Sequence, residues 1–159
     1  QRWEVFTRRI NKIIAEILQI ASASIDLQAM SIEYHDRFLF EGHPSDADVR
    51  VLLRKATEMT HPDAAAGKSL WHLHRGWFED FKTGQVLINQ NFDAQEGLLV
   101  GATTPTRSLQ IMTKAELRAN SMDLSIERFD ENLEILHDLT KSYFKDAIMD
   151  AHFESLGLA

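Results

Sequence analysis

The chain has 159 residues, a formal net charge of −7 and no cysteine. This length is typical of one domain, and 44% apolar with 26% charged residues are ordinary values for a globular protein. The absence of cysteine excludes a disulfide scaffold, thiolate metal sites and thiol catalysis. The negative charge argues against nucleic acid as a partner, and no apolar run is long enough to span a bilayer. Because no signal-peptide pattern is present either, we expect a cytoplasmic protein.

An amphipathic helix is expected at the N-terminus, because apolar residues recur there every three or four positions. The stripe comprises Phe6, Ile10, Ile13, Ile14, Ile17, Ala21 and Ile25. Similar spacing continues through Leu27, Met30, Tyr34 and Phe38, and no proline or glycine intervenes before Gly42. The sequence therefore predicts one long helix over about residues 2–40, which Gly42 and Pro44 end.

The middle of the chain shows a weaker pattern. Ser45 is a good N-cap for a short helix that ends before His61 and Pro62. Residues 69–82 are rich in aromatic side chains and histidine, and residues 85–102 are compatible with short strands or with irregular helix. Thr104 and Pro105 suit the start of another helix, within which Thr113 and Glu116 fit a capping box.

The apolar stripe returns from Leu124 to about Leu156 and predicts a second long helix. The fold class that we expect is all-α: a helical bundle with two long terminal helices around an irregular, aromatic-rich middle. It should form one domain over residues 1–159. Since the chain opens at Gln1 without a Met, we expect a fragment of a longer protein. The residues expected to be mostly buried are Ile10, Ile14, Ile17, Leu52, Leu53, Trp71, Phe129, Leu133, Leu136 and Tyr143.

Almost all of the net charge falls in the last helix. Residues 121–154 contain nine acidic and three basic residues, a net −6 of the chain's −7. One interpretation is a solvated helix face, and the other is a surface that binds a basic partner.

Two Glu-x-x-His pairs, Glu58 with His61 and Glu134 with His137, have the spacing that ferritin-like di-metal carboxylate proteins use. Solvent-exposed side chains are the alternative. A second candidate metal site is His72 and His74 with a helper such as His35. Without cysteine, the cofactor would be a metal ion bound by histidine and carboxylates. The alternative is a small aromatic core that these imidazoles cap, and a single histidine in an apolar helical pocket would also be enough for haem.

No catalytic motif is present: we find no Gly-x-Ser-x-Gly, Walker loop, dinucleotide fingerprint or His-Glu-x-x-His. The sequence therefore identifies no enzyme, and although a catalytic carboxylate pair stays open, no spacing singles one out.

One stretch resembles a known family. Leu70-Trp71-x-x-His74-Arg75-Gly76, followed by aromatic residues, is similar to a Leu-Trp-x-x-His-Lys-Gly stretch in the helical middle domain of globin-coupled diguanylate cyclases. Trp71, His74 and Gly76 match residue by residue. More distantly, the layout resembles the zinc-binding helical domain of chemoreceptors. Arg75 replaces the expected lysine, His72 is additional, and the absence of cysteine leaves the chemoreceptor zinc site incomplete.

This resemblance implies a non-catalytic bacterial sensory or signal-relay domain that passes a signal through its terminal helices to an output domain. We expect a homodimer with the terminal helices at its interface, and a ligand lined by Trp71, His74, Trp77 and Phe81. The alternatives are an interaction domain that binds a basic partner through the acidic last helix, and a ferritin-like di-metal protein.

Overall fold

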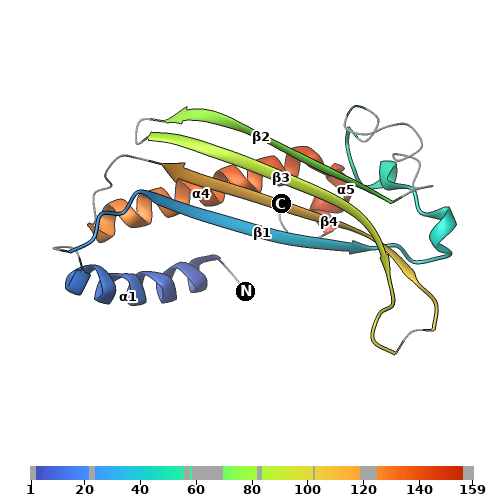
Figure 1. The fold of residues 1–159 in the computed structure, drawn as a ribbon, viewed down its shortest axis with the longest axis horizontal. Coiled ribbons are helices and arrows are strands. Elements are labelled where there is room, and N and C mark those ends of the chain that lie inside the picture. The colour runs from blue at the N-terminus through green and yellow to red at the C-terminus, as the bar shows by residue number, and fades with distance from the viewer. Residues whose placement is uncertain are drawn as a thin grey trace.

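The computed structural model describes residues 3–21, 24–55, 58, 70–81, 84–101, 103–118 and 125–155, and it has a mixed α/β fold (Figure 1). Its helices are α1 (Trp3–Ala21), α4 (Ile126–Ala147) and α5 (Asp150–Ser155). Its strands are β1 (Ala29–Leu39), β2 (Trp71–Phe81), β3 (Gly84–Gly97) and β4 (Thr106–Arg118). Two short 3-10 turns, η1 (Pro44–Asp46) and η2 (Val49–Val51), follow β1.

The predicted all-α helical bundle is therefore wrong. The first helix ends at Ala21; Ile25 and Leu27 of the predicted stripe lie in the connection that follows, and its last residues belong to β1. Met30, Tyr34 and Phe38 misled the prediction because a spacing of four residues fits one face of a helix and also one face of a strand. The expected irregular middle consists instead of two long regular strands, and the capping-box residues Thr113 and Glu116 lie within β4.

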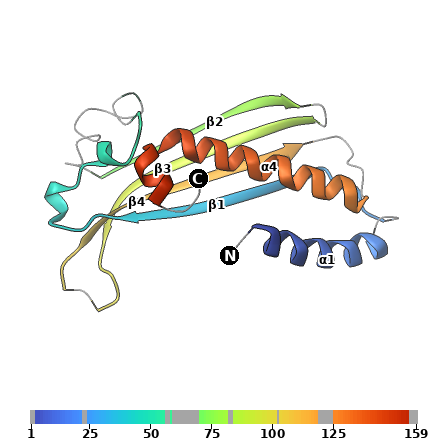
Figure 2. The same ribbon diagram turned by 180° about the vertical axis from the view of Figure 1, so that it is seen from behind.

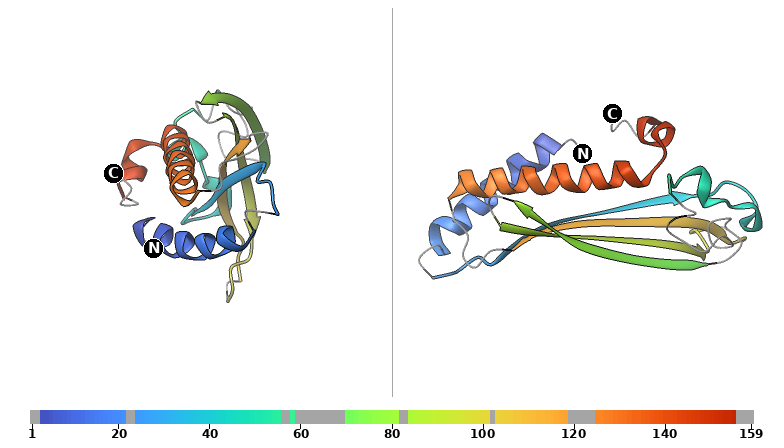
Figure 3. Two further views of the ribbon diagram at one scale, coloured as in Figure 1. Left: turned by 90° about the vertical axis from the view of Figure 1, so that its left-hand side faces the viewer. Right: turned by 90° about the horizontal axis from the view of Figure 1, so that it is seen from above.

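The four strands form one antiparallel sheet in the order β1-β4-β3-β2, so β1 and β2 are its edges. Side chains alternate between the two faces, as the pleat requires. Helix α4 crosses one face, and α1 and α5 lie on that same side, as Figures 2 and 3 show. We call the opposite face, which no described helix covers, the open face. The resemblance motif forms part of β2 and is therefore not helical.

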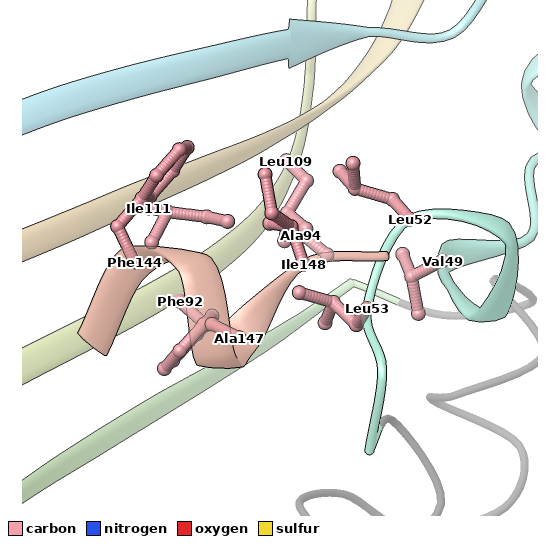
Figure 4. Packing of buried hydrophobic residues seen from close by; sticks show 10 residues of the cluster. All are labelled: Val49, Leu52, Leu53, Phe92, Ala94, Leu109, Ile111, Phe144, Ala147 and Ile148. Atoms are coloured by element: carbon pink, nitrogen blue, oxygen red, sulfur yellow. The ribbon is translucent and has the colours of Figure 1, made fainter. Parts of the chain in front are cut away.

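The core between α4 and the sheet consists of two apolar clusters. One cluster, drawn in Figure 4, joins the C-terminal end of α4 to β3, β4 and the residues around η2; it includes Leu53, Phe92 and Ile148. The other surrounds Ile88 and Leu136, and the aromatic ring of Trp77 packs against it. The predicted burial of Leu52, Leu53, Leu133 and Leu136 is confirmed. Ile17 is 47% exposed, so its predicted burial is wrong.

The predicted C-terminal helix is confirmed over α4, but it ends at Ala147 and does not run on to Leu156 as expected, because a separate helix, α5, begins at Asp150. Ser125 caps its N-terminus, because the Ser125 hydroxyl accepts a hydrogen bond from the Arg128 amide. At the other end, the chain after η2 pairs with the residues that follow the helix. The Arg54 amide donates to the Ala147 carbonyl at 3.0 Å, and the Met149 amide donates to the Leu52 carbonyl at 2.8 Å. This pairing fixes Arg54 beside the end of α4.

None of the helices in the described part of the chain combines the length and the apolar character needed to cross a membrane.

Candidate functional site: a basic cleft at the edge of the sheet

Edge strand β2, the C-terminal end of α4 and the residues after η2 lie close together at one end of the sheet (Figure 2). A cleft of about 720 Å³ opens between their side chains. Its lining combines four basic side chains with two aromatic rings and two carboxylates: Arg54, Lys55, Arg75, Lys145, Trp77, Tyr143, Asp146 and Asp150. A cleft with several cations beside aromatic surfaces is suited to an anion that also carries an apolar group. We call it the basic cleft.

Arg75 is the most informative residue of the basic cleft. It lies on the helix-facing side of β2, and burial lowers the pKa of its guanidinium group. Its guanidinium carbon lies 5.6 Å from the ring centre of Trp77 and 5.4 Å from that of Phe92. No carboxylate among the described residues forms an ion pair with it. A half-buried cation normally has an acidic partner, because desolvation without one is costly.

The guanidinium is held in place by Gln90, a fully buried residue of β3. Arg75 Nε and Nη2 donate to Gln90 Oε1 at 3.0 and 2.5 Å. The Gln90 amide nitrogen in turn donates to Thr113 Oγ1 and to the Tyr143 carbonyl oxygen, at 3.3 and 3.2 Å. These bonds use two of the five guanidinium N–H groups, and the other three have no acceptor among the described residues. Arg75 therefore has donors left for a ligand.

Arg75 and Gln90 belong to a line of polar residues that crosses the sheet between the two apolar clusters. Register pairs Arg75 with Gln90, Gln90 with Thr113, and Thr113 with Tyr34. We call these four residues the polar row. Its far end is at β1, where the Tyr34 hydroxyl and His137 Nδ1 on α4 are 2.9 Å apart. Buried polar groups of this kind are tolerated only where they are hydrogen-bonded.

The aromatic wall of the cleft is fixed by Glu79. Its Oε1 accepts a hydrogen bond from Trp77 Nε1 at 3.0 Å and another from the Tyr143 hydroxyl. The two rings meet edge to face with centres 5.0 Å apart. The indole therefore has a fixed orientation, with Arg75 over its ring.

The rim is partly neutralised. Arg54 Nη2 donates to Asp150 Oδ1 at 2.6 Å, and this hydrogen bond lowers the pKa of the Asp150 carboxyl. Lys55 Nζ lies 4.0 Å from Glu58 Oε2, at the outer limit of an ion pair. The rim thus holds three cations, Arg54, Lys55 and Lys145, against three carboxylates, Asp146, Asp150 and Glu58, and it adds little net charge around Arg75.

The structure separates the four residues predicted to line a ligand. Trp71, Trp77 and Phe81 lie on the helix-facing side of β2, whereas His74 lies on the open face. Only Trp77 lines the basic cleft. Trp71 and Phe81 pack against the two different apolar clusters.

The predicted metal ligands His35, His72 and His74 all lie on the open face, but not together. His72 pairs with Asp93, and His35 contacts Glu33 and Gln110. The strand registers place His35 and His74 in one row at the opposite edges of the four-stranded sheet. At about 4.8 Å between neighbouring strands, the two residues are about 14 Å apart. Among the residues that the structure describes, no three or more His, Asp or Glu side chains are grouped so that they could hold a metal ion.

The second Glu-x-x-His pair joins α4 to α1. The indole nitrogen of Trp3 donates to both carboxylate oxygens of Glu134, at 2.8 and 2.9 Å. The same indole stacks on His137, with ring centres 3.8 Å apart. Burial lowers the pKa of His137 and outweighs the opposite effect of Asp138 and Glu134. In the first pair, Glu58 is described and His61 lies outside the described residues.

The acidic character of the last helix is partly balanced within the chain. Glu134 accepts from Trp3, Asp130 accepts from Asn11 at 2.6 Å, and Glu131 pairs with Arg128. Binding of a basic partner by this helix stays a prediction.

Arg75 and Gln90 were not predicted as site residues. The sequence does carry a signal for Arg75, because apolar residues recur at every second position of this stretch, as in a strand with one buried face. Arg75 lies on the same face as Trp71, Leu73, Trp77 and Phe81. Arg75 and Glu79 are the two charged residues on this otherwise apolar strand face, and such charges are candidates for binding.

Comparison of the chain with protein-family models, curated proteins and solved structures found no match in any of the three.

Proposed function

We propose that this chain is a ligand-binding domain of the sensory type, and that its basic cleft binds a small anion carrying a planar apolar group. The observation that carries the proposal is Arg75, a half-buried guanidinium without an acidic partner among the described residues. A bound carboxylate or phosphate would supply the missing negative charge and accept the remaining N–H groups. Trp77 and Tyr143 offer aromatic surface for the apolar part.

The proposal keeps the sensory role that the resemblance at Trp71, His74 and Gly76 implies, but it does not depend on a helical bundle. Helix α4 contributes Tyr143, Lys145 and Asp146 to the cleft and holds α1 through Glu134 and His137. A ligand that contacts the end of α4 would therefore act on the element that positions α1. This gives a route from the cleft to the N-terminal helix.

The test uses four probes: benzoate, acetate, phenyl phosphate and inorganic phosphate. Thermal unfolding is measured with each, because a ligand at ten times its Kd stabilises the folded state by about 1.4 kcal/mol, about 3–6 °C in Tm. We expect the phenyl-bearing probes to raise Tm more than acetate and phosphate do. Comparing benzoate with phenyl phosphate identifies the preferred anion.

The matched variants are Arg75→Gln and Arg37→Gln. Arg37 lies on the open face of β1, where it donates to Ser108 Oγ, so its loss removes the same charge away from the cleft. Arg75→Gln should weaken binding at least about tenfold, because it removes a charge-assisted hydrogen-bond donor, and Arg37→Gln should not. Equal binding by both variants would contradict the proposal, as would a wild-type protein that responds to none of the probes.

A further inference from the structure

Helix α1 carries a long apolar stripe of which only part is covered. Six residues with alternating spacings of three and four form it: Trp3, Phe6, Ile10, Ile13, Ile17 and Ile20. Trp3 stacks on His137, and Ile10 packs against the apolar cluster around Leu136. Phe6, Ile13, Ile17 and Ile20 are 39%, 55%, 47% and 83% exposed. Figure 3 shows α1 beside α4, where the covered edge lies. The other four side chains of the stripe are exposed to solvent.

The spacing of this stripe is that of a coiled-coil seam. A three-four repeat keeps apolar side chains on the line where two helices cross at a shallow angle, and each side chain inserts between residues of the facing helix. Four large apolar side chains in one continuous exposed line are unusual on a monomer surface. The geometry suits a second helix of the same pattern.

The charges beside the stripe specify how that second helix would run. Arg9 and Glu16 lie on the same flank, seven residues apart, and neither has an ion-pair partner among the described residues. In an antiparallel pair related by a twofold axis, Arg9 of each copy faces Glu16 of the other. A parallel pair would place both residues opposite Ile14 and Ala21, which offer no charge.

We infer that two copies of this chain associate through α1 in an antiparallel pair. Phe6 of one copy packs near Ile17 of the second, and Ile13 packs near the part of the Ile10 side chain that its own domain leaves accessible. Arg9 and Glu16 form two equivalent ion pairs across the interface. The interface is separate from the basic cleft, so it does not depend on the proposed function.

The first experiment is sedimentation equilibrium of the 159-residue chain at several concentrations. We expect a dimer for the wild type and a monomer for Ile13→Lys. Val51→Lys is the matched control, because Val51 is 60% exposed at η2 and should leave the dimer intact. A monomeric wild type, or a dimer unchanged by Ile13→Lys, would overturn the inference.

Charge exchange tests orientation with substitutions that leave the apolar stripe unchanged. Arg9→Glu alone and Glu16→Arg alone should each raise the dimer Kd about tenfold, because each places like charges opposite one another twice. The double variant should restore the wild-type Kd. A double variant that dimerises no better than the single variants would overturn the antiparallel arrangement and with it the inference.

Spin labels give an independent readout, because the chain has no cysteine of its own. Lys12→Cys lies near the twofold axis, and Gln19→Cys lies seven residues away on the same helix flank. In the antiparallel pair, the two labels at residue 19 should be separated along the helix axis by about 21 Å more than those at residue 12. Similar distances at both positions would indicate a parallel pair and contradict the inference. If a different partner bound α1, each complex would carry only one spin label, and no distance between two labels would be measured.

Discussion

Gln90 is the residue that makes a partly buried arginine possible in this core. Its oxygen accepts from Arg75, and its nitrogen is committed to Thr113 and to the backbone of Tyr143. Every polar atom of the side chain is therefore used at a position with no exposed surface. The amide fixes the guanidinium without neutralising it, which is what an anion site requires.

Replacing Gln90 with leucine tests this arrangement. The variant leaves the Arg75 donors and the Tyr143 carbonyl without their partner, so the free energy of unfolding should fall by about 1–3 kcal/mol. Urea denaturation measures the change. Gln85→Leu, on the exposed face of the same strand, is the control and should change stability by less than about 0.5 kcal/mol. A Gln90→Leu variant as stable as the control would mean that the hydrogen bonds contribute little.

His137 should make stability depend on pH. Burial lowers its folded-state pKa below the unfolded value of about 6.5, so protonation favours the unfolded chain. Stability is fully present above about pH 6.5 and falls as the pH drops through the folded-state pKa. Burial also raises the folded-state pKa of Asp36 above its value in the unfolded chain. The stability that Asp36 contributes is therefore present below its unfolded-state pKa and is lost as the pH rises through its folded-state pKa.

Thermal unfolding between pH 7.5 and 5.5 measures this dependence. The Tm of the wild type should decrease over this range more than the Tm of His137→Gln, which keeps an acceptor for Tyr34 but does not titrate. Parallel decreases in the two proteins would assign the pH dependence to other groups.

At the scale of elements, α1 is attached to the domain through a few residues, Trp3, Ile10 and Asn11, of which Trp3 makes the most contacts. Trp3 donates to Glu134 and stacks on His137, whereas much of the helix surface beyond it is exposed. Trp3→Ala should therefore release α1 before the sheet unfolds. Hydrogen exchange should show loss of protection in α1 with protection in β3 and β4 retained. Val5→Ala, at an exposed position of the same helix, should change neither, and protection of α1 unaffected by Trp3→Ala would show that other contacts hold it.

The elements also show what the sequence could and could not reveal. Helix α4 was predicted, because its apolar stripe has the helical period over its whole length and Ser125 supplies a cap. The strands were missed because their inward faces contain polar residues. Arg75 interrupts β2, Gln90 interrupts β3 and Thr113 interrupts β4, so the alternation of apolar residues is broken at the same level of the sheet.

The residues that concealed the strands are thus three of the four residues in the polar row. A fully apolar inward face would have predicted the strands and would have held no site. Local sequence patterns fail most readily where a fold carries a functional feature. The position of Arg54 and Lys55 beside Arg75 depends on pairing between residues distant in the chain, such as Leu53 with Ile148, and no local pattern reveals it.

At the scale of the whole molecule, α4 connects the parts that matter for the proposed sensory role. Its C-terminal end borders the basic cleft and contacts Gln90 through the Tyr143 carbonyl, its middle contacts Tyr34 through His137, and Glu134 holds α1. Ligand binding at one edge of the sheet and association through α1 would then involve one shared helix. Such coupling requires that the ligand bind two arrangements of α4 with different affinity.

The most direct measurement is an NMR titration of the wild-type chain with phenyl phosphate, followed at the Nε–H signal of Arg75 and the indole N–H signals of the three tryptophans. The account predicts saturable shifts at Arg75 and Trp77, and loss of the Trp77 shift in Arg75→Gln. Arg75 and Trp77 signals that stay unchanged throughout the titration, or a Trp77 shift that persists in Arg75→Gln, would contradict it.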